Sequence, residues 1–439
     1  MKKSVIALIL LAVLIIIVSP GIVGKLAENS VGENLNWAAR ESGELVVTSE
    51  AFDRGWFSSE GQHRVSLGDG QLRTVVESLA GDADVDQLPV LLINTHIDHG
   101  LIAVSSMGRE EGSLAPGLGR AVSTLAVDLG DGEIVNLPGT IYSKVGIAGH
   151  LDSHYLLEAG STETVDGTVT WEPTRINVVS SPSSGDVDYN GKIGKMTFGD
   201  AQQLVAIDGV TFAGEQQRTS YGFNVGNFDM NVGTMTVTAG GMPMSGMEGV
   251  MLKASSSLDG DVVAAAMRME MSGQKIPNFG DVSVIADMNL TGLDAEAMGI
   301  LSKRLKGLGS SQDPNKLLLE AEEEFKQLFA AGFDVSVNQL DVGLPMGTVE
   351  TKMAFNFPAA DGANFVWTSL LLNAAAQINL RVPEALVQLA TSMNPQAGAI
   401  VGMGYLKKEG DVYVMDAEFK KGLLTVNGAP IPIPMGAFQ

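Results

Sequence analysis

In the stretch VETKMAFNF, residues 349–357, mainly apolar side chains alternate with mainly polar or charged ones. Val349, Met353 and Phe355 fall on one side, and Glu350 and Lys352 fall on the other. The stretch DVSVIADMNL, residues 281–290, alternates in the same way. A period of two places one side of a strand in a core and the other in water, which is typical of antiparallel sheet. These segments therefore predict a protein built mainly of antiparallel strands.

Turn dipeptides extend this prediction along the chain. Asp-Gly and Asn-Gly pairs tolerate the positive φ angles that tight hairpins need. Asp166-Gly167 and Asp259-Gly260 each separate two strand-like segments and predict hairpins. Such pairs begin at Asp69, Asp131, Asp166, Asn190, Asp208, Asp259, Asp361 and Asn427. Turns spread in this way favour many antiparallel strands over repeated βαβ units, so we expect an extended, curved antiparallel sheet with a few packed helices.

The helices are expected late in the chain. Residues 293–306 place Asp294 at the start and basic residues in the last turn, which suits the helix dipole. Asp313-Pro314 opens a second helix that ends at Gly332, and together the two form a helical subregion over residues 293–332. Pro383 opens a third. The fold class is therefore mainly β with some α.

An apolar segment precedes this body. Residues 4–24 carry no charge and follow Lys2 and Lys3. About 20 apolar residues cross a ~30 Å hydrocarbon core as a helix, with the positive end kept in the cytoplasm. We expect residues 1–24 to be an uncleaved, single-pass transmembrane anchor and residues 25–439 to lie in the periplasm. A cleaved signal peptide is the alternative, and both put the body on the same side.

Composition limits the function of the body. Fifty-one acidic against 28 basic residues give a formal net charge of −23, which disfavours nucleic acid as a partner. The chain has no cysteine, which excludes disulfides, thiolate catalysis and zinc–thiolate sites. The basic start and the lone apolar segment suit a bacterial inner membrane. The partners expected are that membrane, through the anchor, and a lipid or another envelope protein.

Four of the five histidines lie in two short runs, residues 96–99 and 150–154. On a strand, His96 and Asp98 share a face while His99 points away. A periplasmic hydrolase that uses His96, Asp98 or His99 is one alternative function. Neither G-x-S-x-G nor H-E-x-x-H occurs, so no residue is assigned as catalytic.

Asp186, Asp188 and Asn190, followed by Gly191, match the first half of a calcium-binding loop. Thr197 stands where such a loop needs a bidentate Glu. An acidic hairpin turn is the competing interpretation. No cofactor is expected, and calcium, which would stabilise a scaffolding protein, is kept as an alternative.

Residues 230–271 hold nine methionines. Methionine fills irregular gaps and also forms adaptable binding surfaces. The glycine-rich segment 240–247 is expected to be a loop that carries Met242, Met244 and Met247. These three are the candidate ligand-binding residues.

Several short motifs resemble a known family. They are Arg54-Gly55-Trp56-Phe57-Ser58-Ser59, His99-Gly100, Leu293-Asp294-Ala295 and residues 422–428 with Asn427-Gly428. With the short anchor, they occur in the order found in the YdgA-like family of bacterial envelope proteins, although Leu101 stands where that family often has proline. The resemblance implies a protein anchored in the inner membrane with a periplasmic body. The family has no established activity, so the motif residues are interpreted as structural.

The leading hypothesis is a non-catalytic, membrane-anchored periplasmic protein that binds an apolar ligand or envelope partners. A calcium-stabilised scaffold and a hydrolase are the alternatives.

Overall fold

The computed structural model describes twelve stretches of the chain. They are residues 45–54, 58–68, 90–99, 119–128, 134–146, 150–164, 167–181, 184–200, 202–276, 280–308, 321–360 and 373–431. The described residues form two compact units. The first unit runs to Arg218 and includes Ala239–Gly241 and residues 305–308. The second takes Thr219–Thr238, Met242–Arg304 and the described residues from Ala321 onward.

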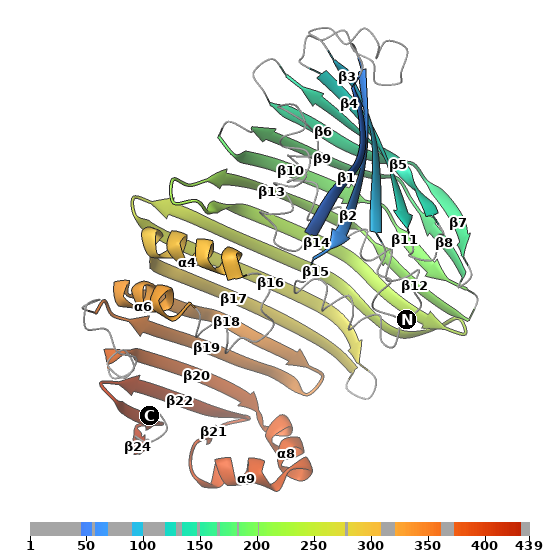
Figure 1. Cartoon of the computed structure of the whole chain (residues 1–439). Helices are drawn as coiled ribbons and strands as arrows, with labels where there is room; N and C mark the ends of the chain where they lie inside the picture. Colours follow the sequence, from blue (N-terminus) through green and yellow to red (C-terminus); the bar gives the residue numbers. More distant parts are fainter. Residues whose placement is uncertain are drawn as a thin grey trace. The chain divides into compact units, whose positions relative to one another are not determined.

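The first unit is an antiparallel sheet of strands that pair in the order β1-β2-β3-β4-β5-β6-β9-β10-β13 (Figure 1). A second series, β7-β8-β11-β12, pairs in the same antiparallel way. The strands are β1 (Leu45–Arg54), β2 (Ser58–Leu67), β3 (Val90–His99), β4 (Gly119–Asp128), β5 (Ile134–Val145), β6 (Leu151–Leu157), β7 (Gly160–Thr164), β8 (Gly167–Trp171), β9 (Thr174–Ser181), β10 (Asp186–Ile193), β11 (Met196–Gly199), β12 (Gln203–Asp208) and β13 (Val210–Arg218).

The second unit is an antiparallel sheet with helices at its strand ends. Strands β15 to β20 pair in chain order, β20 pairs with β22, and β22 carries β21 and β23 on its other side. The strands are β14 (Asn224–Ala239), β15 (Met242–Asp259), β16 (Val262–Ile276), β17 (Gly280–Asp294), β18 (Phe333–Leu344), β19 (Gly347–Phe357), β20 (Ala375–Pro383), β21 (Lys407–Glu409), β22 (Val412–Lys420), β23 (Leu423–Val426) and β24 (Ala429–Ile431). The helices are α4 (Ala295–Leu308), α6 (Glu322–Ala331), α8 (Glu384–Met393) and α9 (Pro395–Gly402).

The prediction of a mainly antiparallel β fold with a few helices is confirmed. The hairpin at Gly167 joins β7 to β8, and the Asp259-Gly260 turn joins β15 to β16. Helix α4 starts after Asp294, whose carboxylate accepts the backbone N–H of Ala297 at 2.8 Å. Helix α8 starts after Pro383, as expected.

Asn190-Gly191 is not a turn, contrary to the prediction. It lies inside β10, where Asn190 pairs with Asn177 on one side and Ala213 on the other. A Cβ atom on Gly191 would come within 2.3 Å of the Phe212 ring. The glycine is therefore present because an aromatic ring covers it, and not because the chain reverses.

Within the described ranges, no helix is both long and apolar enough to span a membrane. The expected anchor, residues 1–24, lies outside these ranges, as do residues 309–320 between the two helices of the predicted subregion 293–332.

Most buried side chains of the first unit lie on one face of its sheet, and Asp98 and Ala126 are buried on the other. Val65 on β2 is opposite Leu91 on β3, and Leu151 on β6 is opposite Val145 on β5, and all four are buried. Buried hydroxyls share this face: Thr95 pairs with Ser123 at 2.8 Å, and Ser153 with Ser143 at 2.8 Å. Each hydroxyl satisfies another, so these polar groups are buried without a large desolvation penalty.

Candidate functional site: an apolar sheet face

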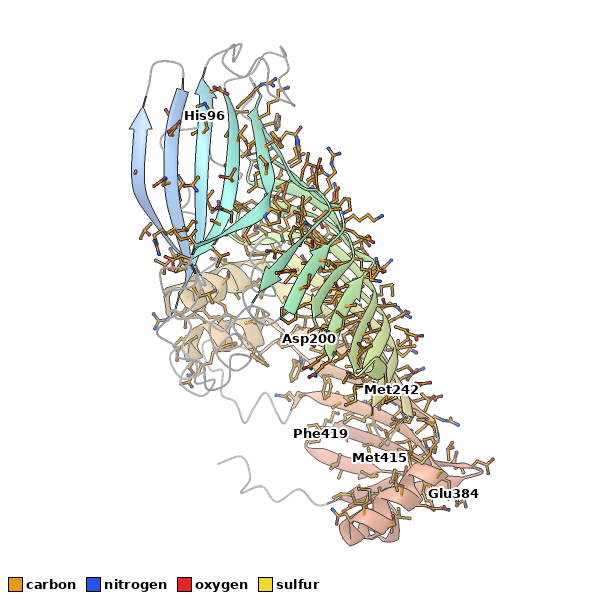
Figure 2. The ribbon with its side chains drawn as sticks, turned by 90° about the vertical axis from the view of Figure 1, so that its right-hand side faces the viewer. His96, Asp200, Met242, Glu384, Met415 and Phe419 are labelled. Carbon is orange, nitrogen blue, oxygen red and sulfur yellow. The ribbon has the colours of Figure 1, made fainter. Side chains whose placement is uncertain are left out.

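One face of the second unit's sheet is almost wholly apolar, and we call it the apolar face. Strand register aligns its side chains in rows that run across the strands. One row runs Ala254, Met267, Met288, Val337, Met353, Ile378, Ala417 and Val426. The next runs Leu252, Met269, Ala286, Leu340, Thr351, Leu380 and Met415. A third contains Val335, Phe355, Ala376, Phe419 and Leu424. Figure 2 labels one residue of β22 from each of the last two rows, Met415 from the second and Phe419 from the third.

The opposite face of the same sheet is polar. Arg268 forms ion pairs with Asp287 at 3.0 Å and Glu270 at 2.6 Å. Asn379 donates a hydrogen bond to Asp416 at 2.6 Å. These groups satisfy one another, and they lie on the side of the sheet opposite the rows that contain Met267 and Met288.

The apolar face is only partly covered. Met267 and Met288, directly opposite each other on β16 and β17, are 38% and 36% exposed. Met353, Ile378 and Phe419 are half-buried. Large exposed apolar surfaces on folded proteins mark binding sites more often than chance. This face is therefore the best candidate for a functional surface.

Helices limit the face at its two ends. Phe329 of α6 packs edge-on against Phe333 and Phe357, with ring centroids 5.0 Å and 5.6 Å apart. Those two phenylalanines stand opposite each other at one end of β18 and β19. Helix α8 follows the far end of β20, and Figure 1 shows α6 and α8 at opposite ends of the strands. Between them lies the half-exposed part of the face.

The three methionines that the sequence singled out do not lie in a loop. Met242, Met244 and Met247 belong to β15, which begins directly after the Gly240-Gly241 turn. The prediction of a loop over residues 240–247 is thus wrong, because the chain reverses in two glycines with φ of 57° and 76°. Met242 and Met244 are 71% and 61% exposed, and Met247 is half-buried.

His96 and Asp98 share a face of β3, as expected. His96 Nε2 lies 3.3 Å from an oxygen of Asp98, and His96 Nδ1 lies 3.4 Å from an oxygen of Glu60. Asp98 is 1% exposed. Both ring nitrogens face carboxylates, which leaves neither to activate a hydroxyl nucleophile. This geometry does not support the hydrolase, and of His99 only the position at the end of β3 is described.

The remaining histidines have separate partners. His150 Nδ1 lies 2.7 Å from the hydroxyl of Ser181, and the His154 ring stacks on Tyr142 with centroids 5.5 Å apart. His63 is buried on β2, and burial lowers its pKa below 6.5. His63 lies on β2, His154 lies on β6 and His150 directly precedes β6, and among the described residues they form no group that could hold a metal ion.

Asp186, Asp188 and Asn190 lie along β10, and not around a loop. Alternate residues of a strand are ~6.8 Å apart along its axis, so their oxygens do not converge on one ion. The side chain of Asn190 also accepts a hydrogen bond from Asn177 at 2.8 Å. In the described part of the chain, no set of three or more His, Asp or Glu side chains is placed to hold a metal.

Asn427, from the motif at the end of the chain, joins three segments. Its backbone N–H donates to Asp416 O at 2.7 Å, and its side-chain oxygen accepts the Asp416 N–H at 2.9 Å. Its side-chain amide donates to the carbonyls of Gly404 and Tyr405. On this edge of β22, β21 pairs with residues 412–414 and β23 pairs with residues 417–420. Asn427 bonds to the backbone of Asp416, which lies between these two pairings. Asn427 has φ of 49° and Gly428 has φ of 79°, which explains an Asn-Gly pair here.

The other motif residues are only partly described. Arg54 ends β1 and is opposite Ser59 on β2, which places the motif at a hairpin. Gly55, Trp56, Phe57 and Gly100 lie outside the described residues.

Comparison with known proteins agrees with these motifs. A family model described as "Bacterial protein of unknown function (DUF945)" matches residues 1–434. The chain belongs to this family. It is also 23% identical over 280 residues to Protein YdgA of Escherichia coli (strain K12), which confirms the YdgA-like resemblance. That alignment covers 58% of this chain and 51% of YdgA, so the match spans about half of the curated relative. No solved structure matches the chain.

Sequence reasoning missed the residues at the centre of the apolar face. The run Met267-Arg268-Met269-Glu270-Met271 carries the signal, because its methionines alternate with charged residues. Nothing in that run indicates that Met288 would stand opposite Met267, since this follows from strand register.

Proposed function

We propose that this chain is a non-catalytic bacterial envelope protein that binds acyl chains on the apolar face of its second unit. The apolar rows across β15, β16, β17, β18, β19, β20, β22 and β23, with Met267 and Met288 exposed among them, carry this proposal. At ~4.8 Å between strands, the face extends about 34 Å across them, which is longer than one extended acyl chain.

The chemistry of the face favours a hydrocarbon over a charged or sugar ligand. Its side chains are aliphatic, thioether or phenyl groups, with Thr351 as a buried exception. Methionines adjust their three side-chain torsions to ligands of varied shape. At ~0.8 kcal/mol per fully buried methylene, a 16-carbon chain buried on one side contributes on the order of 6 kcal/mol. That is enough for a measurable affinity.

Location is the second part of the proposal. The apolar segment 4–24 after Lys2 and Lys3 supports a single-pass anchor in the inner membrane, with the body in the periplasm. Such an anchor would keep the apolar face close to a source of lipid. A topology reporter fused after Gln439 should be active only outside the cytoplasm, and cytoplasmic activity would contradict this location.

Binding is tested on the full chain in cells. Cells are fed a fatty acid that carries a photoactivatable group and an alkyne, irradiated, and the purified chain is assayed for label. We expect strong label on the wild type and several-fold less on the double variant Met267→Gln, Met288→Gln, because two amides make the middle of the face polar.

Met251→Gln is the matched control. Met251 is half-buried on β15 and stands opposite Glu270, on the polar side of the sheet. Its label should equal that of the wild type. If the wild type takes up no label and instead cross-links to a second copy or to another envelope protein through this face, the acyl-chain proposal is wrong and the face is a protein interface.

A further inference from the structure

We infer that Met267 and Met288 are a modification site at which oxidation to methionine sulfoxide switches off the apolar face. This inference rests on the proposed function, since the effect concerns acyl-chain binding. The two thioethers stand opposite each other in one row, between Ala254 on β15 and Val337 on β18.

Exposure selects these two sulfurs among those of the face. Met267 and Met288 each show more than a third of their surface to solvent, whereas Met269, Met271, Met353 and Met415 are half-buried. Oxidation of methionine needs access of the oxidant to sulfur, so reactivity follows exposure. The pair at the centre of the face should therefore react before its neighbours.

The oxidant is a peroxide. One oxygen atom passes from hydrogen peroxide to the thioether, which forms the S=O bond, breaks the O–O bond and releases water. Sulfur loses two electrons and the peroxide gains them. A methionine sulfoxide reductase reverses the change, and the absence of cysteine leaves the methionines as the main sulfur target of the chain.

The new oxygen is poorly accommodated on this face. Along the strands, Ala265 and Met269 flank Met267, and Ala286 and Leu290 flank Met288. Their side chains offer no hydrogen-bond donor, so the sulfoxide oxygen must keep its water. A hydrated group in the middle of the face removes the gain from desolvation that an acyl chain would bring.

Two methionines that are more exposed than Met267 and Met288 provide internal controls. Met393 at the end of α8 and Met403 after α9 are 73% and 65% exposed, and neither lies in a row of the face. They should oxidise at least as fast as Met267 and Met288. Their oxidation should not affect binding.

The experiment treats the purified full chain with graded hydrogen peroxide. Peptide mass spectrometry follows the gain of one oxygen at each methionine, and the photoactivatable fatty acid measures binding to the same samples. We expect label to fall at least fivefold as Met267 and Met288 oxidise. Met267→Leu with Met288→Leu, which keeps the face apolar, should retain its label under peroxide, whereas Met393→Leu with Met403→Leu should lose it as the wild type does.

The outcomes separate the two claims. If untreated wild type takes up no label, the proposed function fails. If it binds, and fully oxidised Met267 and Met288 leave the label unchanged, only the switch is wrong. Equal loss of label in the double leucine variant would also overturn the switch, since it would place the sensitive methionines elsewhere.

Discussion

The two units of this chain use the same strand pattern and end with different surfaces. In the first unit, the apolar side of the sheet is buried, as at Val65 and Leu151, and it includes paired serine and threonine hydroxyls. In the second unit, the methionines and phenylalanines on the corresponding side stay half-exposed or exposed, although Val337 and Val426 between them are buried. A buried face selects for shape and satisfied hydrogen bonds, whereas an open face tolerates adaptable side chains. The difference is one of exposure: the first unit encloses its apolar side chains, and the second leaves part of its apolar face in water.

The largest expected effect comes from a carboxylate placed on each face. Val65→Asp puts a charge at a position with no exposed surface and should lower the free energy of unfolding by more than about 3 kcal/mol. Met288→Asp leaves its charge hydrated and should cost less than about 1.5 kcal/mol. Urea denaturation of the full chain measures both. If both variants lost a similar free energy of unfolding, the distinction between the buried face of the first unit and the partly exposed face of the second would be wrong.

A smaller effect is expected at Asn427. Asn427→Ala removes three side-chain hydrogen bonds and puts alanine at φ of 49°. The variant should lose about 2–3 kcal/mol, and amide exchange should rise in β21 and β23. Asn427→Gly keeps the turn and loses only the bonds, so it should fall between alanine and wild type. An Asn427→Ala variant as stable as the wild type would show that these hydrogen bonds do not contribute to stability.

The pH dependence of the first unit should follow His63. Burial lowers the pKa of folded His63 below its value of about 6.5 in the unfolded chain, so the unfolded state binds the proton first. Stability is therefore full above about pH 6.5 and falls as the pH drops towards the folded pKa, by at most about 1.4 kcal/mol per pH unit. His63→Leu should show a shallower slope over this window in parallel denaturation series. An unchanged slope would assign the pH dependence to other groups.

The smallest effect concerns Met242 and Met244. Both side chains are mostly in water, so Met242→Gln and Met244→Gln should change stability by less than about 0.5 kcal/mol. If binding of the acyl probe also stays unchanged, Met242 and Met244 are not ligand-binding residues, and binding is assigned to the rows through Met267 and Met288. A selective loss of binding would extend the functional surface to the start of β15.

Local patterns in the sequence predict local structure well here. Alternation identifies the strands around residues 281–290 and 349–357, and Asp259-Gly260 and Pro383 mark a hairpin and a helix start. Asn190-Gly191 wrongly suggests a turn, because a glycine is needed there to make room for the ring of Phe212 on another strand. The methionine segment misleads because glycines at 240 and 241 suggest a longer loop than the two-residue turn that forms.

The candidate surface itself depends on register between distant segments. Met288 meets Val337, and Val337 meets Met353, only in the register that the bulge near Asn338 gives β18 with its two neighbours. A slip of one residue would send these side chains to the polar face. No spacing in the linear sequence encodes that alignment, so the individual strands could be predicted and the surface could not.

The most direct measurement is the lipid that accompanies the full chain when it is purified in mild detergent. Extraction and mass spectrometry should find acyl lipid in stoichiometric amount with wild type and with Met251→Gln, and much less with Met267→Gln, Met288→Gln. No lipid above that in a purification of an unrelated anchored protein, or equal lipid in all three preparations, would contradict the assignment of the apolar face as an acyl-chain binding surface.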